Sequence, residues 1–218
     1  MKHEPVLRQE VQDYLQLDSG EVVVDTTLGL GGHSKDILER IGETGKLYAF
    51  EQDERNLRVA QKNLVAYKDQ IRYFHENFRY LKSRITGMRQ SRIDAVLFDL
   101  GLSSPHVDDP ERGFSFMQEG PLDMRFDKRG KLTAEQVINT FPEQALMEIF
   151  FKYGEEKLSR KIARDICQRR KQIPFKTTVE LADFISEIFP ARLKKKHHHP
   201  ATQVFQALRI EVNDELKV

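Results

Sequence analysis

The chain has 218 residues, of which 39% are hydrophobic and 32% are charged, and its formal net charge is +1. This length is enough for one sizeable core, or for one domain that carries a large insertion. No apolar run approaches the roughly 20 residues of a membrane helix, and the polar amino-terminal residues do not resemble a secretory signal. Because Cys167 is the single cysteine, an internal disulfide is excluded, and we expect a cytoplasmic protein without a membrane partner.

Strand and helix patterns alternate in the first half of the chain. Short apolar runs predict strands, and apolar residues at helical spacing predict helices between them. The strands are expected at residues 21–27, 46–50, 71–74 and 95–98, and the helices at 34–41 and 54–67. The alternation indicates an α/β, Rossmann-like domain with a parallel sheet, in which ligands bind beyond the carboxyl ends of the strands.

Helical patterns dominate the second half, after a loop rich in Gly and Pro. They cover residues 133–139, 142–153, 155–171 and 178–188, and Thr133 with Gln136 forms a candidate capping box while Thr177 or Thr178 is a candidate cap of the last helix. We interpret residues 1–104 as the Rossmann-like domain and 105–195 as a loop and a helical substrate-recognition insertion. A final helix within 196–218 is expected to return the chain to the sheet.

The turn after the first predicted strand reads DTTLGLGGHS, from Asp25 to Ser34. Its glycines allow a ligand to approach the backbone closely, although a plain tight turn is the simpler alternative. A dinucleotide-binding dehydrogenase would need glycine at the position of Ser34. The carboxylate of Asp25 instead suits a cationic ligand such as the sulfonium of S-adenosylmethionine.

Two further candidates follow the next two strands. Glu51 ends the second strand, and its carboxylate can accept hydrogen bonds from both ribose hydroxyls of a nucleoside. Phe78 follows the third strand, where an aromatic ring can flank an adenine; a core phenylalanine is an equally good interpretation. For Glu51 the alternative is a surface acid, and the neighbouring Gln52 and Asp53 leave open which side chain points at the sugar.

The fourth strand leads into DLGLSSPH, from Asp99 to His106. An exocyclic amine is a poor nucleophile, because its lone pair is delocalised into the ring. Acceptors on its two N–H groups hold it about 3–3.5 Å from a methyl group, in line with the leaving group. Asp99, Ser103 and Ser104 are the catalytic candidates for this role, and a Ser-Pro turn that closes the strand is the alternative.

Two basic clusters suggest a polyanionic substrate. Seven Lys or Arg lie between Lys157 and Gln172 against one acid, and RLKKKHHH follows at residues 192–199. A solvated helix face and an exposed loop are the alternatives for any one cluster. Three adjacent histidines in a loop do not converge on one ion without rearrangement, so we predict no metal site.

Taken together, these strings resemble the ribosomal RNA small subunit methyltransferase H family, also called MraW. The resemblance rests on HEPVL, DTTLGLGGHS, FDLGLSSPHVDDPERGFSFMQEGPLDMRFD and HPATQVFQALRIEVNDEL, which span nearly the whole chain. It implies S-adenosylmethionine as cofactor and N4 of a cytosine in the decoding region of 16S ribosomal RNA as methyl acceptor, free or in the small ribosomal subunit. The sequence leaves open whether the chain forms a homodimer.

Carried over by motif, the cofactor contacts are Gly31, Gly32, His33, Glu51, Phe78, Asp99 and His106. Glu51 replaces the family's usual aspartate, and His106 its common glutamine; both keep hydrogen-bonding capacity. The loop 108–127 is expected to close over a flipped or single-stranded cytosine. Phe114, Phe116, Arg112, Met124 and Arg125 would then stack on the base or contact phosphate, unless the loop is packed by its own aromatic residues.

The family pattern continues beyond the VNDEL helix with strands that complete the sheet. We therefore expect an incomplete sheet in this chain and a lower stability than that of the full fold. The alternative function is a truncated homologue that binds the cofactor or RNA without turnover.

Overall fold

The computed structural model describes residues 5–88, 92–190 and 199–216. The described part of the chain forms two compact units, one that ends at Ser103 and one that begins at Ser104, and each is described by itself. Among the described residues, no helix combines the length and the apolar character that crossing a bilayer requires.

The first unit contains a four-stranded, fully parallel sheet. Its strands are β1 (Val22–Asp25), β2 (Lys46–Phe50), β3 (Ile71–Phe74) and β4 (Ala95–Leu97), in the order β3-β2-β1-β4. Asp25 is in register with Ala49 and with Leu97, so the carboxyl ends of the central strands lie at one edge. The predicted α/β class is confirmed, and within the described residues the sheet does not close on itself.

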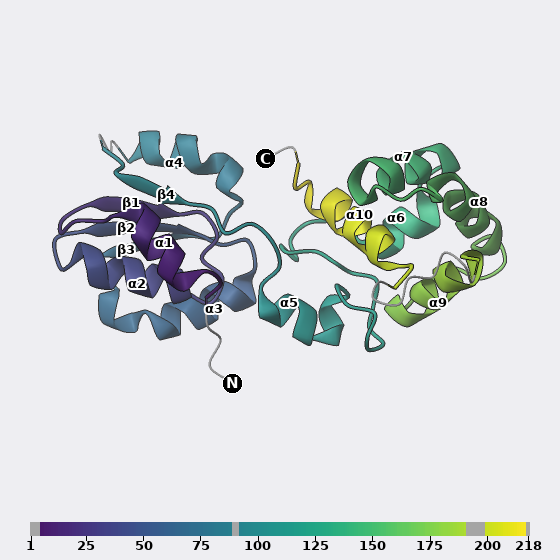
Figure 1. Cartoon of the computed structure of the whole chain (residues 1–218), viewed down its shortest axis with the longest axis horizontal. Coiled ribbons are helices and arrows are strands. Elements are labelled where there is room, and N and C mark those ends of the chain that lie inside the picture. The colour runs from purple at the N-terminus through teal and green to yellow at the C-terminus, as the bar shows by residue number, and fades with distance from the viewer. Residues whose placement is uncertain (1–4, 89–91, 191–198, 217–218) are drawn as a thin grey trace. The chain divides into compact units, whose positions relative to one another are not determined.

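Helices cover both faces of this sheet (Figure 1). Val23, Leu47 and Ala49 form a core with the buried faces of α2 (Gly32–Ile41) and α3 (Glu54–Asn63). The alternate residues Val24, Tyr48 and Phe50 point the other way and pack with α4 (Leu81–Gly87). This alternation follows from the two-residue period of strand side chains.

Two helices of the first unit were not predicted. α1 (Arg8–Leu15) buries no residue, and α4 has only seven residues, so neither shows a clear apolar period. The helix predicted to reach residue 67 ends at Asn63, and a 3-10 turn follows at Val65–Tyr67.

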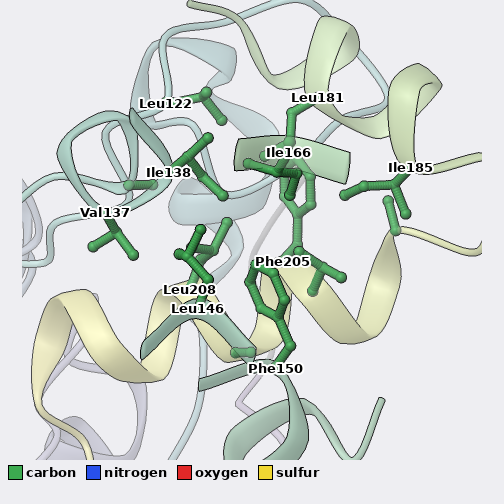
Figure 2. Packing of buried hydrophobic residues seen from close by; sticks show 14 of the residues in the cluster. Leu122, Val137, Ile138, Leu146, Phe150, Ile166, Leu181, Ile185, Phe205 and Leu208 are labelled. Atoms are coloured by element: carbon green, nitrogen blue, oxygen red, sulfur yellow. The ribbon is translucent and has the colours of Figure 1, made fainter. Parts of the chain in front are cut away.

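The second unit is helical. It contains α5 (Ser104–Asp108), a 3-10 turn (Pro110–Arg112), α6 (Ala134–Thr140), α7 (Glu143–Gly154), α8 (Ser159–Arg169), α9 (Thr178–Ile188) and α10 (Thr202–Asn213). Figure 2 shows its core, in which Leu146 and Phe150 of α7 lie close to Phe205 and Leu208 of α10. All four side chains are buried.

The predicted caps can be compared with the helix starts. Thr133 and Gln136 form a complete capping box, and Thr177 accepts a hydrogen bond from the backbone N–H of Glu180, so both predictions are confirmed. The helix predicted from residue 155 begins only at Ser159. Glu155 has a left-handed backbone that ends α7, and the carboxylate of Glu156 accepts from the N–H of Leu158.

The last helix, α10, was expected to return the chain to the sheet. In the structure its buried face packs on α7 and α6, in the second unit. The two helices α7 and α10 approach closely at Gly154, where a Cβ atom would collide with the backbone carbonyl of Gln203. The division of the chain into a cofactor domain, an insertion and a returning helix stays a prediction.

Phe150 and Phe151 offer a matched test of the helical core. Phe150 is 0% exposed and Phe151 is 63% exposed, on the same helix. We expect Phe150→Ala to lower the free energy of unfolding by about 3–5 kcal/mol, because it removes buried area and leaves a cavity. Phe151→Ala should change it by about 0.5 kcal/mol or less. Denaturant unfolding measures both, and equal effects would contradict the described packing.

Candidate functional site

The glycine-rich turn connects β1 to α2 and is held by a buried carboxylate. Asp25 is 1% exposed; its two oxygens accept from the backbone N–H of Thr27 at 3.0 Å and from the hydroxyl of Ser34 at 2.7 Å. Burial raises the pKa of Asp25. Both of its oxygens therefore serve the turn, so Asp25 shapes the site from below rather than presenting its charge directly to a ligand.

Gly31 and Gly32, two predicted cofactor contacts, are also required by packing. Gly31 has a φ of 87°, and a Cβ atom there would lie 2.9 Å from Cδ1 of Leu64, which follows α3, and 3.4 Å from Cβ of Ala60 on α3. At Gly32 a Cβ would collide with the ring of Pro5. Glycine at both positions lets the turn lie against α3 and the amino-terminal segment, whatever ligand is bound.

Glu51 links the end of β2 to this turn. Its Oε2 accepts from the N–H of Gly29 at 2.9 Å, and its Oε1 accepts from the N–H of Asp53 at 2.8 Å. Burial raises the pKa of Glu51 to about 7, and the backbone hydrogen bonds oppose that rise. Each carboxylate oxygen has two lone pairs, so Glu51 retains acceptor capacity for ribose hydroxyls.

His33 and Asp99 face each other across the end of the sheet. Nε2 of His33 lies 3.8 Å from Oδ2 of Asp99; the His33 side chain is 9% exposed and the Asp99 side chain 43%. Nε2 of His33 is buried without a hydrogen-bond partner. Because buried polar atoms are nearly always paired, this atom is the clearest sign of a polar ligand at the site.

The loop after β4 is fixed from two sides. The backbone N–H of Asp99 donates to Oγ1 of Thr27 at 2.8 Å, which ties β4 to the end of β1. Ser103 accepts a hydrogen bond from Nδ2 of Asn56 at 3.0 Å, and Asn56 is 2% exposed on α3. Reasoning from the sequence missed Asn56, because one polar residue in a helix carries no signal of its distant partner.

Phe78 packs partly against the core, and its predicted contact with an adenine stays a prediction. It is partly buried against the core residues under α4, and its ring meets the ring of Phe98 edge to face at 5.5 Å. Phe98 is 49% exposed. Two aromatic rings in contact thus follow β3 and β4, directly before Asp99 in the second case.

Ser104 and His106 belong to the second unit. Ser104 begins α5, and His106 is 4% exposed, with its ring 5.0 Å from those of Phe114 and Phe126. The first unit contains the other predicted residues, namely Gly31, Gly32, His33, Glu51, Phe78, Asp99 and Ser103. That all of them contact one cofactor or acceptor stays a prediction.

The loop 108–127 differs from the expectation of open stacking groups. Phe114 is 8% exposed, Met124 0% and Arg112 2%. Arg125 pairs with Asp123 and donates to the carbonyls of Lys128 and Gly130. The loop is packed by its own aromatic residues, and the expectation of free stacking and phosphate contacts is wrong for these four.

Phe116, the fifth residue of that expectation, packs against His199 and Phe205. His199 is the one member of the predicted histidine cluster that lies within the described residues; 192–198 lie outside them. Its Nδ1 accepts from the N–H of Ala201 at 3.2 Å. This histidine is therefore engaged in packing and in capping the chain before α10.

The basic cluster of residues 157–172 is divided between structural and exposed roles. Arg170 donates to the carbonyls of Ile138 and Phe141, and Arg169 pairs with Glu180. Arg160, Lys161 and Arg164 are exposed on α8. Only part of the charge counted in the sequence is thus available to a partner.

Fold and turn together define an α/β protein whose candidate polar groups, Glu51, His33 and Asp99, lie after the carboxyl ends of its strands or in the turn between them. The profile of the MraW methylase family matches residues 1–218, and the chain belongs to this family.

Solved structures show partial similarity. A protein from Clostridium thermocellum assigned as an rRNA methylase is 23% identical, with a TM-score of 0.41, over 48% of this chain and 56% of that one. An rRNA methylase from Streptococcus thermophilus is 24% identical, with a TM-score of 0.37, over 49% and 59%. The match thus spans somewhat more than half the length of these structures.

Glu51 gives a pH-dependent prediction. A carboxyl whose pKa is raised by folding holds its proton in the folded state when the unfolded state has lost it, so stability falls as pH rises from about 4.5 to about 7. Glu51→Gln cannot ionise, so it does not lose stability in this pH range. The unfolding free energy of the variant minus that of wild type should therefore be larger at pH 8 than at pH 4. Denaturant unfolding at both pH values measures this. Glu54→Gln, an exposed acid three residues on, is the control, and the same gain at both pH values for Glu51→Gln would contradict the raised pKa.

Proposed function

We propose that this chain binds S-adenosylmethionine at the carboxyl ends of its strands and methylates N4 of a cytosine in 16S ribosomal RNA. Membership of the MraW methylase family supports methyl transfer to ribosomal RNA. The single structural observation that favours the cofactor is the buried, unpaired Nε2 of His33 next to the exposed carboxylate of Asp99. A polar ligand with a cationic part satisfies both groups.

The residues present fit this cofactor. Glu51 would accept from the ribose hydroxyls, Phe78 would flank the adenine, and His33 with Asp99 would hold the charged amino-acid end. When bound, S-adenosylmethionine supplies an activated methyl group on a positively charged sulfur. His106, in the second unit, is proposed as a further contact only by motif.

The loop from Asp99 to Ser104 would hold the acceptor amine. The carboxylate of Asp99 can accept from an amine N–H, and the Ser103 and Ser104 hydroxyls are further acceptors. Thr27 fixes the backbone of Asp99 and Asn56 fixes the hydroxyl of Ser103, so these acceptors are oriented before the substrate arrives. Such preorganisation lowers the activation barrier, because the acceptor groups are already ordered and need not be immobilised during the reaction.

The proposed partner is 16S ribosomal RNA, free or within the small subunit. The exposed cations of α8 would contribute contacts to phosphates. Light scattering in solution would decide between a monomer and the homodimer.

Calorimetry and methyl transfer test the proposal in sequence. We expect the purified chain to bind S-adenosylmethionine but not NAD, and to transfer labelled methyl to unmodified small ribosomal subunits, with N4-methylcytidine as the product of digestion. Asp99→Ala should lower the transfer rate by about 10²-fold, because the amine loses its charged acceptor. Undiminished transfer by this variant would refute the role of the loop. Binding without transfer by wild type would identify a homologue without turnover.

Asn56→Ala tests the support of Ser103. We expect a loss of about 1 kcal/mol in unfolding free energy from the missing hydrogen bond, and a lower kcat for methyl transfer with little change in cofactor affinity. Asn63→Ala is the matched control, because Asn63 donates to the carbonyl of Leu30 from the same helix without touching the acceptor loop. Equal kinetic effects of the two variants would exclude a specific role for Asn56.

A further inference from the structure

A third basic stretch lies in the first unit, outside the proposed cofactor site. Residues 71–92 contain six Lys or Arg against one acid, Glu76. In the described part of this stretch Arg72, Arg79, Lys82 and Arg84 are all exposed. Neither cofactor binding nor amine orientation uses them.

Part of this stretch lines a groove between β3 and α4, with a volume of about 500 Å³. Arg72 and His75 come from β3 and the residues after it, and Ser83 and Arg84 come from α4. Phe74, which also lines the groove, packs against the core beneath. The groove thus has apolar and cationic groups side by side, and its size is within the range of small-ligand sites.

The charge of the groove is net positive. Glu76, its one acid, forms an ion pair with Arg84, with Nε 2.6 Å from Oε2. The guanidinium carbon of Arg72 lies 5.7 Å from the centroid of the Phe74 ring. Glu76, which Arg84 already binds, is the one acid among the residues that line the groove. A planar cation beside an aromatic ring suits both a phosphate and the face of a nucleobase.

We propose that this groove binds single-stranded RNA, with a phosphate at Arg72 and a base against its apolar lining. The inference rests on the proposed function, since it gives the RNA substrate a second contact surface on the cofactor-binding unit. Arg79 and Lys82 extend the positive charge beyond the groove along the same segment. A row of cations fits a polyanion better than it fits one small anion.

Fluorescence anisotropy with a short, labelled, cytosine-containing RNA strand tests the groove. We expect Arg72→Gln to weaken RNA binding several-fold and to reduce the slope of log affinity against log salt by about 0.7, the value for one lost phosphate contact on a single strand. Arg84→Gln and Lys82→Gln should act in the same direction. Calorimetry with S-adenosylmethionine checks that each variant is folded, because its affinity should stay that of wild type.

Arg58→Gln is the matched control. Arg58 is an exposed arginine paired with an acid, Glu54, as Arg84 is with Glu76, but it lies on α3, which covers the opposite face of the sheet. It should bind RNA as wild type does. Equal weakening by Arg58→Gln and Arg72→Gln, or no weakening by Arg72→Gln, would overturn the groove as an RNA site.

The failures of the two proposals are distinguishable. If wild type transfers methyl and Arg72→Gln keeps its RNA affinity, the groove proposal is refuted and the proposed methyltransferase function stands. If RNA binding depends on the groove but no methyl transfer occurs, the groove proposal stands and the proposed methyltransferase function is refuted. Binding of inorganic phosphate by wild type, measured by calorimetry, together with no RNA binding would identify a small-anion site and overturn the RNA proposal.

Discussion

The buried carboxylate of Asp25 is the constraint on which the candidate site depends. It holds the N–H of Thr27 and the hydroxyl of Ser34 at once, and so sets the path of the chain between β1 and α2. On that path the backbone N–H of Gly29 donates to Glu51, and the hydroxyl oxygen of Thr27 accepts from the backbone N–H of Asp99. The ends of three strands are thereby connected through one turn. Each oxygen of this buried carboxyl group accepts a hydrogen bond, which offsets part of the cost of removing the group from water.

The regular parts of the fold were predictable because their signals are local. The four strands and the capping box at Thr133 follow from apolar runs and from a spacing of three residues. The conformation of the loop 108–127 was not predictable in this way. Its sequence shows that aromatic and basic residues are present, but whether Phe114 stacks on a substrate or on Phe126 depends on packing between distant residues. The same limit hid the bond from Asn56 to Ser103.

Counting charges in the sequence identified two basic clusters and overlooked a third. In the first cluster, Arg169 and Arg170 bind other residues of the helical unit, so their charges are not available on its surface. In the stretch 71–92, by contrast, charges are spread thinly among aromatic residues, and they gather only when β3 and α4 come together. A cationic surface is thus a property of the folded chain, and the density of Lys and Arg in the sequence is a poor guide to it.

The backbone contact between α7 and α10 has a consequence for any survey of tolerated substitutions. Gly154 leaves no space for even a methyl group beside the carbonyl of Gln203. In a mutational scan this position should reject every replacement as firmly as a reacting group does, because any Cβ atom there would collide with the backbone of α10. Intolerance at this glycine would report the spacing of two helices, and reading it as chemistry would place an active site where there is only close packing.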